Sequence, residues 1–122
     1  AQGSIINISS IHAKLTKPNF SAYSSSKAGL LGLTKSLAVE IGDRVRVNSI
    51  SPAAINTQML MKGFTDNLSG LNKLADYHPS KIIGTTTDVL DAAIYLANGD
   101  KFVNGLEITL DGGISGRLHD PN

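Results

Sequence analysis

Three short apolar runs along the chain predict β-strands, over residues Ser4–Ser9, Arg44–Ser51 and Gly105–Leu110. The near-continuous β-branched residues of the first run are typical of a strand that is covered on both faces. The third run alternates apolar and polar residues with the period of two that a strand requires. The apolar positions are Ile5, Ile6 and Ile8, then Val45, Val47 and Ile50, then Leu106, Ile108 and Leu110.

Two stretches with helical periodicity separate the strands. The first predicts a long helix from about Phe20 to Ile41, which Asn19 or Ser21 can cap and which Gly42 ends. Its apolar stripe consists of Leu30, Leu33, Leu37 and Ile41. Small residues within a helix usually allow another element to approach closely, either a neighbouring helix or the sheet. This helix holds two such residues, Gly29 and Gly32.

The second helical stretch runs from Asp88 to about Ala97, and Thr87 or Thr86 can cap it. Its inward face is predicted to hold Val89, Ala92, Ala93 and Leu96. Strands that alternate with helices in this order are typical of an α/β protein with a parallel sheet.

Residues 58–83 lack a strand signal and hold scattered apolar side chains, among them Met59, Met61 and Phe64. They could form one or two short helices with an apolar face. We interpret the segment as a lid over a small-molecule pocket, because methionine adapts to varied ligands and lids close over sites. The alternative is that these residues cap the core, and both interpretations can hold together.

The candidate chemistry lies between Ser10 and Lys27. Ser10 stands at the carboxyl end of the first strand, which is where open parallel sheets bind ligands. Lys27 follows Tyr23 by one helical turn, so both side chains lie on one helix face. An ammonium about 4 Å from a phenol supplies about 4 kcal/mol at an effective dielectric of about 20. That energy would lower the pKa of a phenol from about 10 to near neutrality. Tyr23 could then act as a general acid/base, while Ser10 bonds the same substrate oxygen.

The loop between the first strand and the long helix holds three further polar residues. His12 could contact a substrate or relay a proton, but we favour a solvent-exposed loop histidine. Lys14 and Lys17 are interpreted as solvated charges. At the other end of the chain, Asp111 could look catalytic in isolation.

Composition excludes several classes of function. The chain of 122 residues has 41% hydrophobic and 17% charged residues, which is ordinary for one globular domain. A net charge of +1 gives no basic patch that would favour nucleic acid. There is no cysteine, which excludes disulfides and thiol catalysis. No apolar stretch reaches the length of a membrane span, so we expect a cytoplasmic location.

The segments GSIINISS, YSSSK, RVRVNSISPAAINT and LDGG, in this order and spacing, resemble the short-chain dehydrogenase/reductase family. The resemblance implies hydride transfer between a nicotinamide cofactor, NAD or NADP, and a small carbonyl or secondary alcohol substrate. Ser10, Tyr23 and Lys27 match the catalytic serine, tyrosine and lysine of the family. The lysine also bonds the ribose of the cofactor, and the Asp-Gly-Gly segment makes a tight turn, which gives Asp111 a structural role.

The segment from Pro52 to Thr57 resembles the Pro-Gly-x-Ile-x-Thr segment of the family, which holds the nicotinamide carboxamide. The resemblance places Pro52, Ala53, Ile55 and Thr57 at the cofactor. An amide needs one donor and one acceptor, which a backbone peptide beside a hydroxyl provides. Ala53 departs from the pattern, because glycine is usual at its position. Thr57 could instead cap a following helix.

Members of this family usually have about twice this length, and their glycine-rich phosphate-binding turn has no counterpart here. The catalytic asparagine of the family is also without a counterpart. We therefore interpret residues 1–122 as a partial Rossmann-like domain. It would be the carboxyl-terminal half of a doubly wound parallel sheet, with three strands, the long active-site helix, the lid at 58–83 and a final helix. The full-length protein is expected to be a homo-oligomer.

Two alternative functions stay open. A nucleotide-sugar epimerase or dehydratase uses a similar tyrosine and lysine, but the Pro-Ala-x-Ile-x-Thr and Asp-Gly-Gly segments favour the simple dehydrogenases. An enoyl reductase is disfavoured, because its tyrosine and lysine lie further apart than four residues. The second alternative is a truncated, non-catalytic chain whose sheet another polypeptide completes.

Overall fold

The structure is a computed structural model that describes residues 2–118 and residue 120. Its strands are β1 (Gly3–Ile8), β2 (Val45–Pro52) and β3 (Glu107–Leu110), and its α-helices are α1 (Ser21–Ile41), α2 (Gln58–Lys62), α3 (Leu68–Tyr77) and α4 (Thr86–Asn98). Two short 3-10 helices follow β1 and β3, namely η1 (Ile11–Ala13) and η2 (Ile114–Gly116). The predicted strands and helices are all present, with ends that differ by a few residues.

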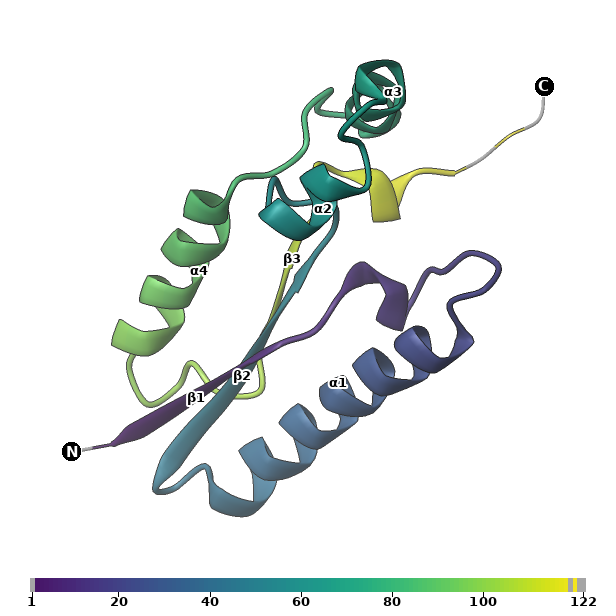
Figure 1. The fold of residues 1–122 in the computed structure, drawn as a ribbon. Coiled ribbons are helices and arrows are strands. Elements are labelled where there is room, and N and C mark those ends of the chain that lie inside the picture. The colour runs from purple at the N-terminus through teal and green to yellow at the C-terminus, as the bar shows by residue number, and fades with distance from the viewer. Residues whose placement is uncertain (1, 119, 121–122) are drawn as a thin grey trace.

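The strands of the described residues form one parallel sheet in the order β1-β2-β3. Helices α1 and α4 lie on opposite faces of this sheet, which gives three layers (Figure 1). The arrangement confirms the α/β, Rossmann-like fold predicted from the sequence. All strands run in one direction, so their carboxyl ends meet at the edge that carries η1 and the segment leading to α2.

The sheet face toward α4 carries the apolar core. Ile50, Ala92 and Leu96 are buried there and form the core. Half-buried side chains surround them, namely Ile6, Val89, Ala93, Val103, Ile108 and Leu110. The inward face predicted for this helix is therefore confirmed.

The sheet face toward α1 is mixed, because Asn7 and the buried Val47 both lie on it. The predicted apolar stripe is corrected at one position, Leu33, whereas Leu30, Leu37 and Ile41 are half-buried. The buried residues of α1 are Thr34 and Ala38, whereas Leu33 is 48% exposed. Thr34 fits because its Oγ1 accepts a hydrogen bond of 3.0 Å from Nδ2 of Asn7 on β1. The small or hydroxylated side chains of Thr34 and Ala38 let this part of the helix lie close to the strands.

Gly29 and Gly32 point away from the sheet. Both are exposed, and a Cβ built at either position would have no neighbouring atom within 4 Å. Crowding against the sheet therefore does not explain these glycines. Gly42 ends α1 as predicted. A Cβ there would collide with the Ala38 carbonyl oxygen and with the Asn104 side chain, which favours glycine at this position.

Strand β1 forms one edge of the sheet within the described residues. Ile5 and Ile8 remain 38% and 43% exposed, so the prediction of a strand covered on both faces is wrong for this chain. The reason is geometric, since α1 packs mainly over β2 and no described strand lies beside β1.

The predicted helix caps are also corrected. Phe20 precedes α1 and gives no side-chain cap, while Asn19 adopts a left-handed backbone with φ of 72°. Helix α4 begins earlier than predicted, because Thr85 and Asp88 form a reciprocal capping box. Such a box needs the acid three residues after the cap, and Asp88 meets that spacing only from Thr85.

Arg46 on β2 is buried beside the end of α4, a position that its sequence context does not indicate. It is 3% exposed and donates hydrogen bonds to the carbonyl oxygens of Leu96 (2.8 Å), Ala97 (3.1 Å) and Val103 (3.1 Å). The last carbonyl groups of a helix lack partners within the helix and carry partial negative charge. The Arg46 guanidinium therefore caps α4 and links this helix to β2, the central strand of the sheet.

We expect Arg46→Leu to lower the free energy of unfolding by about 3 kcal/mol, because it leaves buried carbonyl groups without donors. Urea denaturation of the intact protein measures this change. The matched control is Arg44→Leu, since the Arg44 side chain is 71% exposed and should change stability by less than about 0.5 kcal/mol. Equal stability losses in the two variants would contradict the assignment.

Among residues 2–118 and 120, no helix combines the length and the apolar character that a membrane span requires.

Candidate active site

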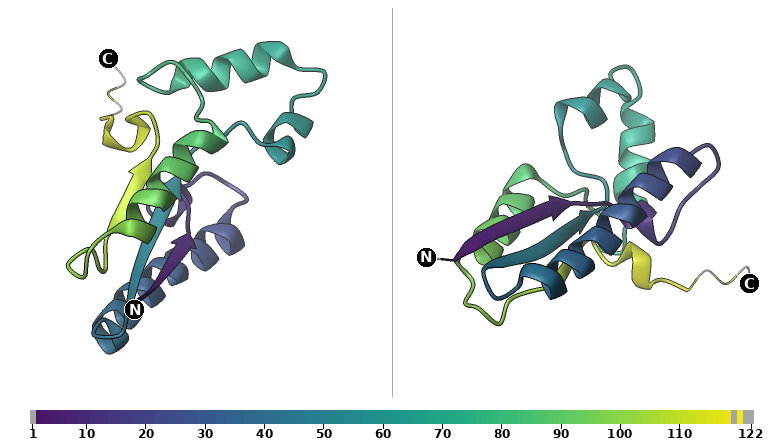
Figure 2. Two further views of the ribbon diagram at one scale, coloured as in Figure 1. Left: turned by 90° about the vertical axis from the view of Figure 1, so that its left-hand side faces the viewer. Right: turned by 90° about the horizontal axis from the view of Figure 1, so that it is seen from below.

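Three segments with candidate site residues meet at the carboxyl edge of the sheet. Ser10 follows β1, residues 53–57 follow β2, and Asp111 follows β3. The start of α1 lies beside η1, which brings Tyr23 to the same end of the molecule (Figure 2). The parallel topology places the three segments that follow the strands at one end of the sheet, as the sequence predicted for Ser10.

Ser10 is the N-cap of η1 and is 6% exposed. Its Oγ accepts a hydrogen bond of 3.1 Å from the backbone N–H of His12. This bond fixes the position of the oxygen and leaves the hydroxyl hydrogen free to be donated. Ser10 is thereby prepared to donate to a negatively polarised oxygen.

Tyr23 and Lys27 lie one turn apart on α1, and the structure brings them together. The Lys27 Nζ lies 5.6 Å from the centroid of the Tyr23 ring. It also donates a hydrogen bond of 3.0 Å to the carbonyl oxygen of Ile8, the last residue of β1. The Ser9 hydroxyl donates to the Lys27 carbonyl oxygen at 2.9 Å, so both ends of this lysine are held at the tip of β1.

The hydroxyl of Tyr23 has no hydrogen-bond partner among the described residues, and the side chain is 44% exposed. The described residues therefore contain no direct bond from Tyr23 to Ser10 or Lys27. The predicted trio occupies one end of the molecule, with the phenol open to solvent, while its joint chemistry remains a proposal.

The position of His12 corrects the prediction of a solvent-exposed loop histidine. Its ring stacks on Phe20 with centroids 4.6 Å apart and an interplanar angle of 10°. Its ring also meets that of Tyr23 at 5.6 Å and 82°. Partial burial and the nearby Lys17 charge lower the pKa of His12, because both disfavour the imidazolium. His12 is therefore a neutral member of an aromatic cluster at neutral pH.

The Lys14 side chain is 61% exposed, which agrees with a solvated charge, but it also forms an ion pair that the sequence did not indicate. Its Nζ lies 2.6 Å from Oε1 of Glu107 on β3, and the Ser51 hydroxyl donates to Oε2 at 2.7 Å. Partial burial opposes ionisation of Glu107, but the bonds from Lys14 and Ser51 outweigh it and hold the pKa below its ordinary value. The ion pair joins the loop after β1, at one edge of the sheet, to β3 at the other edge.

This ion pair predicts a pH dependence of stability. A carboxyl group whose pKa is lower in the folded than in the unfolded protein contributes to stability. This contribution is fully present at a pH above the pKa of the group in the unfolded chain, and it is lost as the pH falls through the pKa of the group in the folded protein. We expect the urea midpoint of the intact protein to fall on acidification below about pH 4.5, and to fall less in Glu107→Gln. Glu40→Gln, at an exposed position of α1, should follow the parent. Parallel curves for all three proteins would contradict the role of Glu107.

The segment after β2 presents the groups that the sequence predicts for a carboxamide. No described residue accepts a hydrogen bond from the Ile55 N–H. Thr57 caps α2, since its Oγ1 accepts a bond of 3.2 Å from the N–H of Leu60. The helix-cap alternative is therefore present in the structure, and the threonine hydroxyl can still donate its own hydrogen. Pro52 ends β2, and Ala53 donates its N–H to the Leu110 carbonyl oxygen at 2.8 Å.

The predicted lid segment forms two short helices, α2 and α3, which stand above the carboxyl edge of the sheet (Figure 1). Several of its apolar side chains face solvent, with Met59 84% and Leu68 70% exposed. The helices agree with the prediction from the sequence, and their role as a lid stays a prediction.

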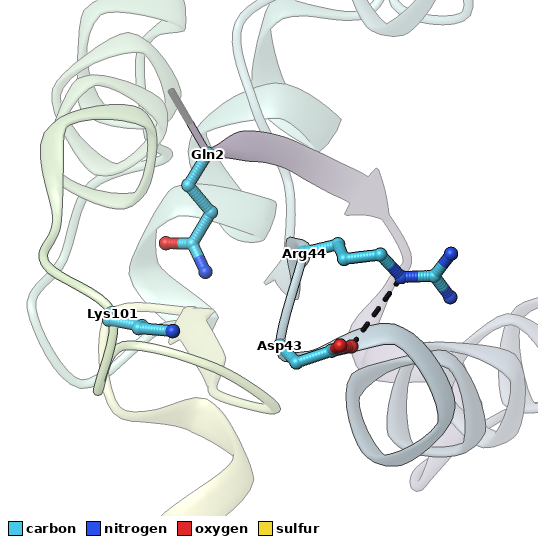
Figure 3. A pocket seen from close by; sticks show the side chains of 4 residues that line it. All are labelled: Gln2, Asp43, Arg44 and Lys101. Carbon is cyan, nitrogen blue, oxygen red and sulfur yellow. Dashed lines mark ion pairs between the residues drawn. The ribbon is translucent and has the colours of Figure 1, made fainter.

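Two shallow cavities lie at opposite ends of the strands. One of 440 Å³ is lined by Gln2, Asp43, Arg44 and Lys101, which precede the strands or lie at their amino ends (Figure 3). This end is remote from Ser10, so the larger cavity is not the candidate site. The other, of 280 Å³, lies at the carboxyl ends of β2 and β3, and Ala53 and Ile55 contribute to its lining.

Asp111 serves the turn that follows β3. Its carboxylate accepts hydrogen bonds of 3.0 Å from the N–H groups of Gly113 and Ser115, and one from the Ser115 hydroxyl. Gly113 has φ of 88°, a left-handed conformation that favours glycine. Partial burial opposes ionisation, but these bonds lower the pKa of Asp111. The geometry is that of a turn-forming aspartate.

Comparison with known proteins identifies the family of the chain. A family model described as enoyl-(acyl carrier protein) reductase matches residues 1–115. The 3-oxoacyl-[acyl-carrier-protein] reductase FabG of Chlamydia muridarum is 37% identical over 115 residues, which are 93% of this chain and 45% of that protein. The 3beta-hydroxysteroid dehydrogenase 1 of Eggerthella lenta is 39% identical over 117 residues, which are 93% of this chain and 44% of that protein.

A solved structure described as ElxO with NADP bound superposes with a TM-score of 0.86 at 35% identity. The match covers 94% of this chain and 47% of that chain. The chain thus spans about half the length of the relatives it matches. The family match over nearly all described residues, together with these relatives and the shared fold, shows that the chain belongs to the short-chain dehydrogenase/reductase family.

Proposed function

We propose that this chain supplies the proton-transfer half of an NAD(P)-dependent oxidoreductase that acts on small carbonyl compounds or secondary alcohols. The observation that carries this proposal is the anchoring of Lys27 at the tip of β1, beside the ring of Tyr23. The Lys27 ammonium donates to the Ile8 carbonyl oxygen at 3.0 Å, which holds it at the end of β1 and near the Tyr23 ring. Such an arrangement serves a phenol that must exchange its proton near neutral pH.

In the proposed reaction, Tyr23 donates its phenolic proton to the carbonyl oxygen of the substrate as negative charge develops there. Ser10 donates its hydroxyl hydrogen to the same oxygen, since its own oxygen is already held by the His12 N–H. Lys27 stabilises the phenolate that remains, because an ammonium favours the charged form of a nearby acid. In the reverse direction, Tyr23 takes the proton from an alcohol.

The residues after β2 fit a nicotinamide ring. The Ile55 N–H can donate to the carboxamide oxygen, and Thr57 Oγ1 can accept from the carboxamide nitrogen. Pro52 and Ala53 would line the ring, and Lys27 and Tyr23 would contact the ribose. The bound coenzyme would supply the hydride. Some relatives support this assignment, since the structure of ElxO contains NADP.

Carbonyl reduction is a better fit to the site than enoyl reduction, although the matching family model is described by the latter. The reason is that Tyr23 and Lys27 lie a single helical turn apart. Two relatives are named for 3-oxoacyl and 3beta-hydroxysteroid compounds, and these compounds carry a ketone or an alcohol at the reacting carbon.

Residues 58–83 are proposed to form the substrate lid. The exposed face of α1 that holds Gly29 and Gly32 is proposed to contact another subunit.

Titration of the intact protein with NADH and NADPH, followed by turnover with 3-oxoacyl thioesters, hydroxysteroids and sugars, tests the proposal. We expect saturable binding of one coenzyme and its oxidation by at least one ketone. A folded protein that binds neither coenzyme would contradict the proposed function.

Lys27→Met should weaken coenzyme binding and move the basic limb of the pH–rate profile toward pH 10, the ordinary pKa of a phenol. The ammonium that lowers the pKa of the reacting tyrosine is absent in this variant, which explains the shift. Lys35→Met, two turns further along α1, is the matched control and should leave both quantities near those of the parent. An unchanged profile together with unchanged binding in Lys27→Met would remove this lysine from the mechanism.

A further inference from the structure

We propose that His12 is a positioning residue that holds Ser10 and the ring of Tyr23 in one fixed arrangement. The inference rests on the proposed function for its catalytic meaning, but the contacts that carry it are independent of any activity. His12 is the middle residue of η1, which directly follows Ser10. The loop that leads to α1 separates it from Tyr23 in the sequence.

The backbone of His12 ties the two candidate residues to one point. Its N–H donates to the Ser10 Oγ at 3.1 Å, and its carbonyl oxygen accepts a bond of 2.5 Å from the hydroxyl of Ser24. Ser24 adjoins Tyr23 in the first turn of α1. One residue therefore bonds the candidate serine directly and the helix turn of the candidate tyrosine through Ser24.

The His12 side chain adds a direct contact to the proton donor. The Tyr23 ring meets the His12 ring at 5.6 Å and 82°, and the Phe20 ring at 6.0 Å and 90°. His12 and Phe20 are themselves stacked at 4.6 Å. Both edge-to-face geometries are favourable for aromatic pairs. Because the Tyr23 hydroxyl has no bond among the described residues, these rings and Lys27 are what orient the phenol.

The contact requires a flat ring more than it requires an imidazole nitrogen. Nδ1 lies 3.1 Å from Oγ1 of Thr16 in an exposed contact, whereas the ring faces meet Phe20 and Tyr23. Phenylalanine at position 12 can keep the stack on Phe20 and the edge contact to Tyr23. Leucine fills a similar volume but cannot form either contact. This difference separates a positioning role from direct proton transfer by His12.

Kinetics of the intact protein test the positioning role. A misplaced reacting group costs up to about 10²-fold in rate, so we expect kcat to fall about 10- to 100-fold in His12→Ala and His12→Leu. Coenzyme affinity should stay within about twofold of the parent, because a positioning residue acts on the chemical step. His12→Phe should recover most of the lost rate, and Thr16→Val should lose little. Full activity in both ring-less variants, or equal losses in His12→Phe and His12→Leu, would overturn the proposal.

A second measurement does not depend on activity. In protein labelled at tyrosine, the NMR signals of the Tyr23 ring, assigned from Tyr23→Phe, should move in His12→Ala, His12→Leu and Phe20→Leu. Signals of Tyr77 and Tyr95 should stay in place and report that the fold is retained. Unmoved Tyr23 signals would overturn the positioning role whatever the enzyme does. Moved signals in a protein without coenzyme-dependent turnover would instead support the ring contact and count against the proposed function.

Discussion

Replacing Tyr23 by phenylalanine should abolish turnover of the intact protein and leave coenzyme binding nearly unchanged. The substitution keeps the ring, and with it the contacts to His12, Phe20 and Lys27. It removes the hydroxyl that would supply the proton. Loss of a general acid typically costs 10² to 10⁴ in rate, which would bring this enzyme to the limit of detection. Steady-state kinetics and coenzyme titration of the same preparation measure the two effects separately.

The controls for this prediction lie in the same chain. Tyr95→Phe on α4 removes a hydroxyl from a tyrosine of similar exposure, 55% against 44%, and should keep the parent rate. Ser10→Ala should have an intermediate effect, on the order of 10² to 10³, as for removal of one oxyanion donor. If Tyr23→Phe kept more than about a tenth of the parent activity, another group would have to be the proton donor.

Residues 1–122 produced alone should be insoluble, or should remain in solution only by pairing with another chain. Strand β1 is the edge of the described sheet, and its Ile5 and Ile8 are 38% and 43% exposed. An apolar strand edge is a template for aggregation. The buried core is also small, with Ile50, Ala92 and Leu96 at its centre. Because the polypeptide lacks a glycine-rich phosphate turn, it should show no saturable binding of NADH or NADPH at sub-millimolar concentration.

A charge on that edge provides the matched variant. Ile5→Lys places an ammonium on β1, whose outer edge has no partner strand among the described residues. A charge on an edge strand deters association with other strands, so the variant should increase the soluble fraction. Sedimentation and thermal unfolding of both polypeptides measure the difference. A soluble monomer of residues 1–122 with a sharp unfolding transition would contradict this prediction. It would also favour the alternative of a stable, non-catalytic chain.

Those parts of the fold that depend on local pattern could be predicted from the sequence. The β-branched run before Ser10 and the spacing from Tyr23 to Lys27 each involve neighbours within a few residues. Helix and strand periodicity act over the same range, so all three strands and the main helices were found. The candidate catalytic residues rest on the same local spacing and on the family resemblance, and their roles stay a prediction.

Contacts between distant segments could not be predicted in this way. Arg46 bonds the end of α4 some 50 residues away, and Lys14 pairs with Glu107 at a separation of 93 residues. Neither pairing leaves a periodic signal in the sequence. The sequence predicts an exposed His12, because its partial burial depends on the loop conformation that brings its ring onto Phe20. The spacing of three between Phe20 and Tyr23 was the one local signal of an aromatic cluster.

Transfer of deuterium from labelled coenzyme to a carbonyl substrate tests the central claim most directly. The intact protein would be incubated with NADH or NADPH that carries deuterium at the transferable position, together with 3-oxoacyl thioesters, ketosteroids and ketoses. The product would be analysed by mass spectrometry. The proposed function predicts an alcohol that carries one deuterium on the former carbonyl carbon, formed by the parent and by Tyr95→Phe but not by Tyr23→Phe. The proposed function would be contradicted if folded parent protein formed no labelled alcohol with either coenzyme. It would also be contradicted if Tyr23→Phe formed as much labelled alcohol as the parent.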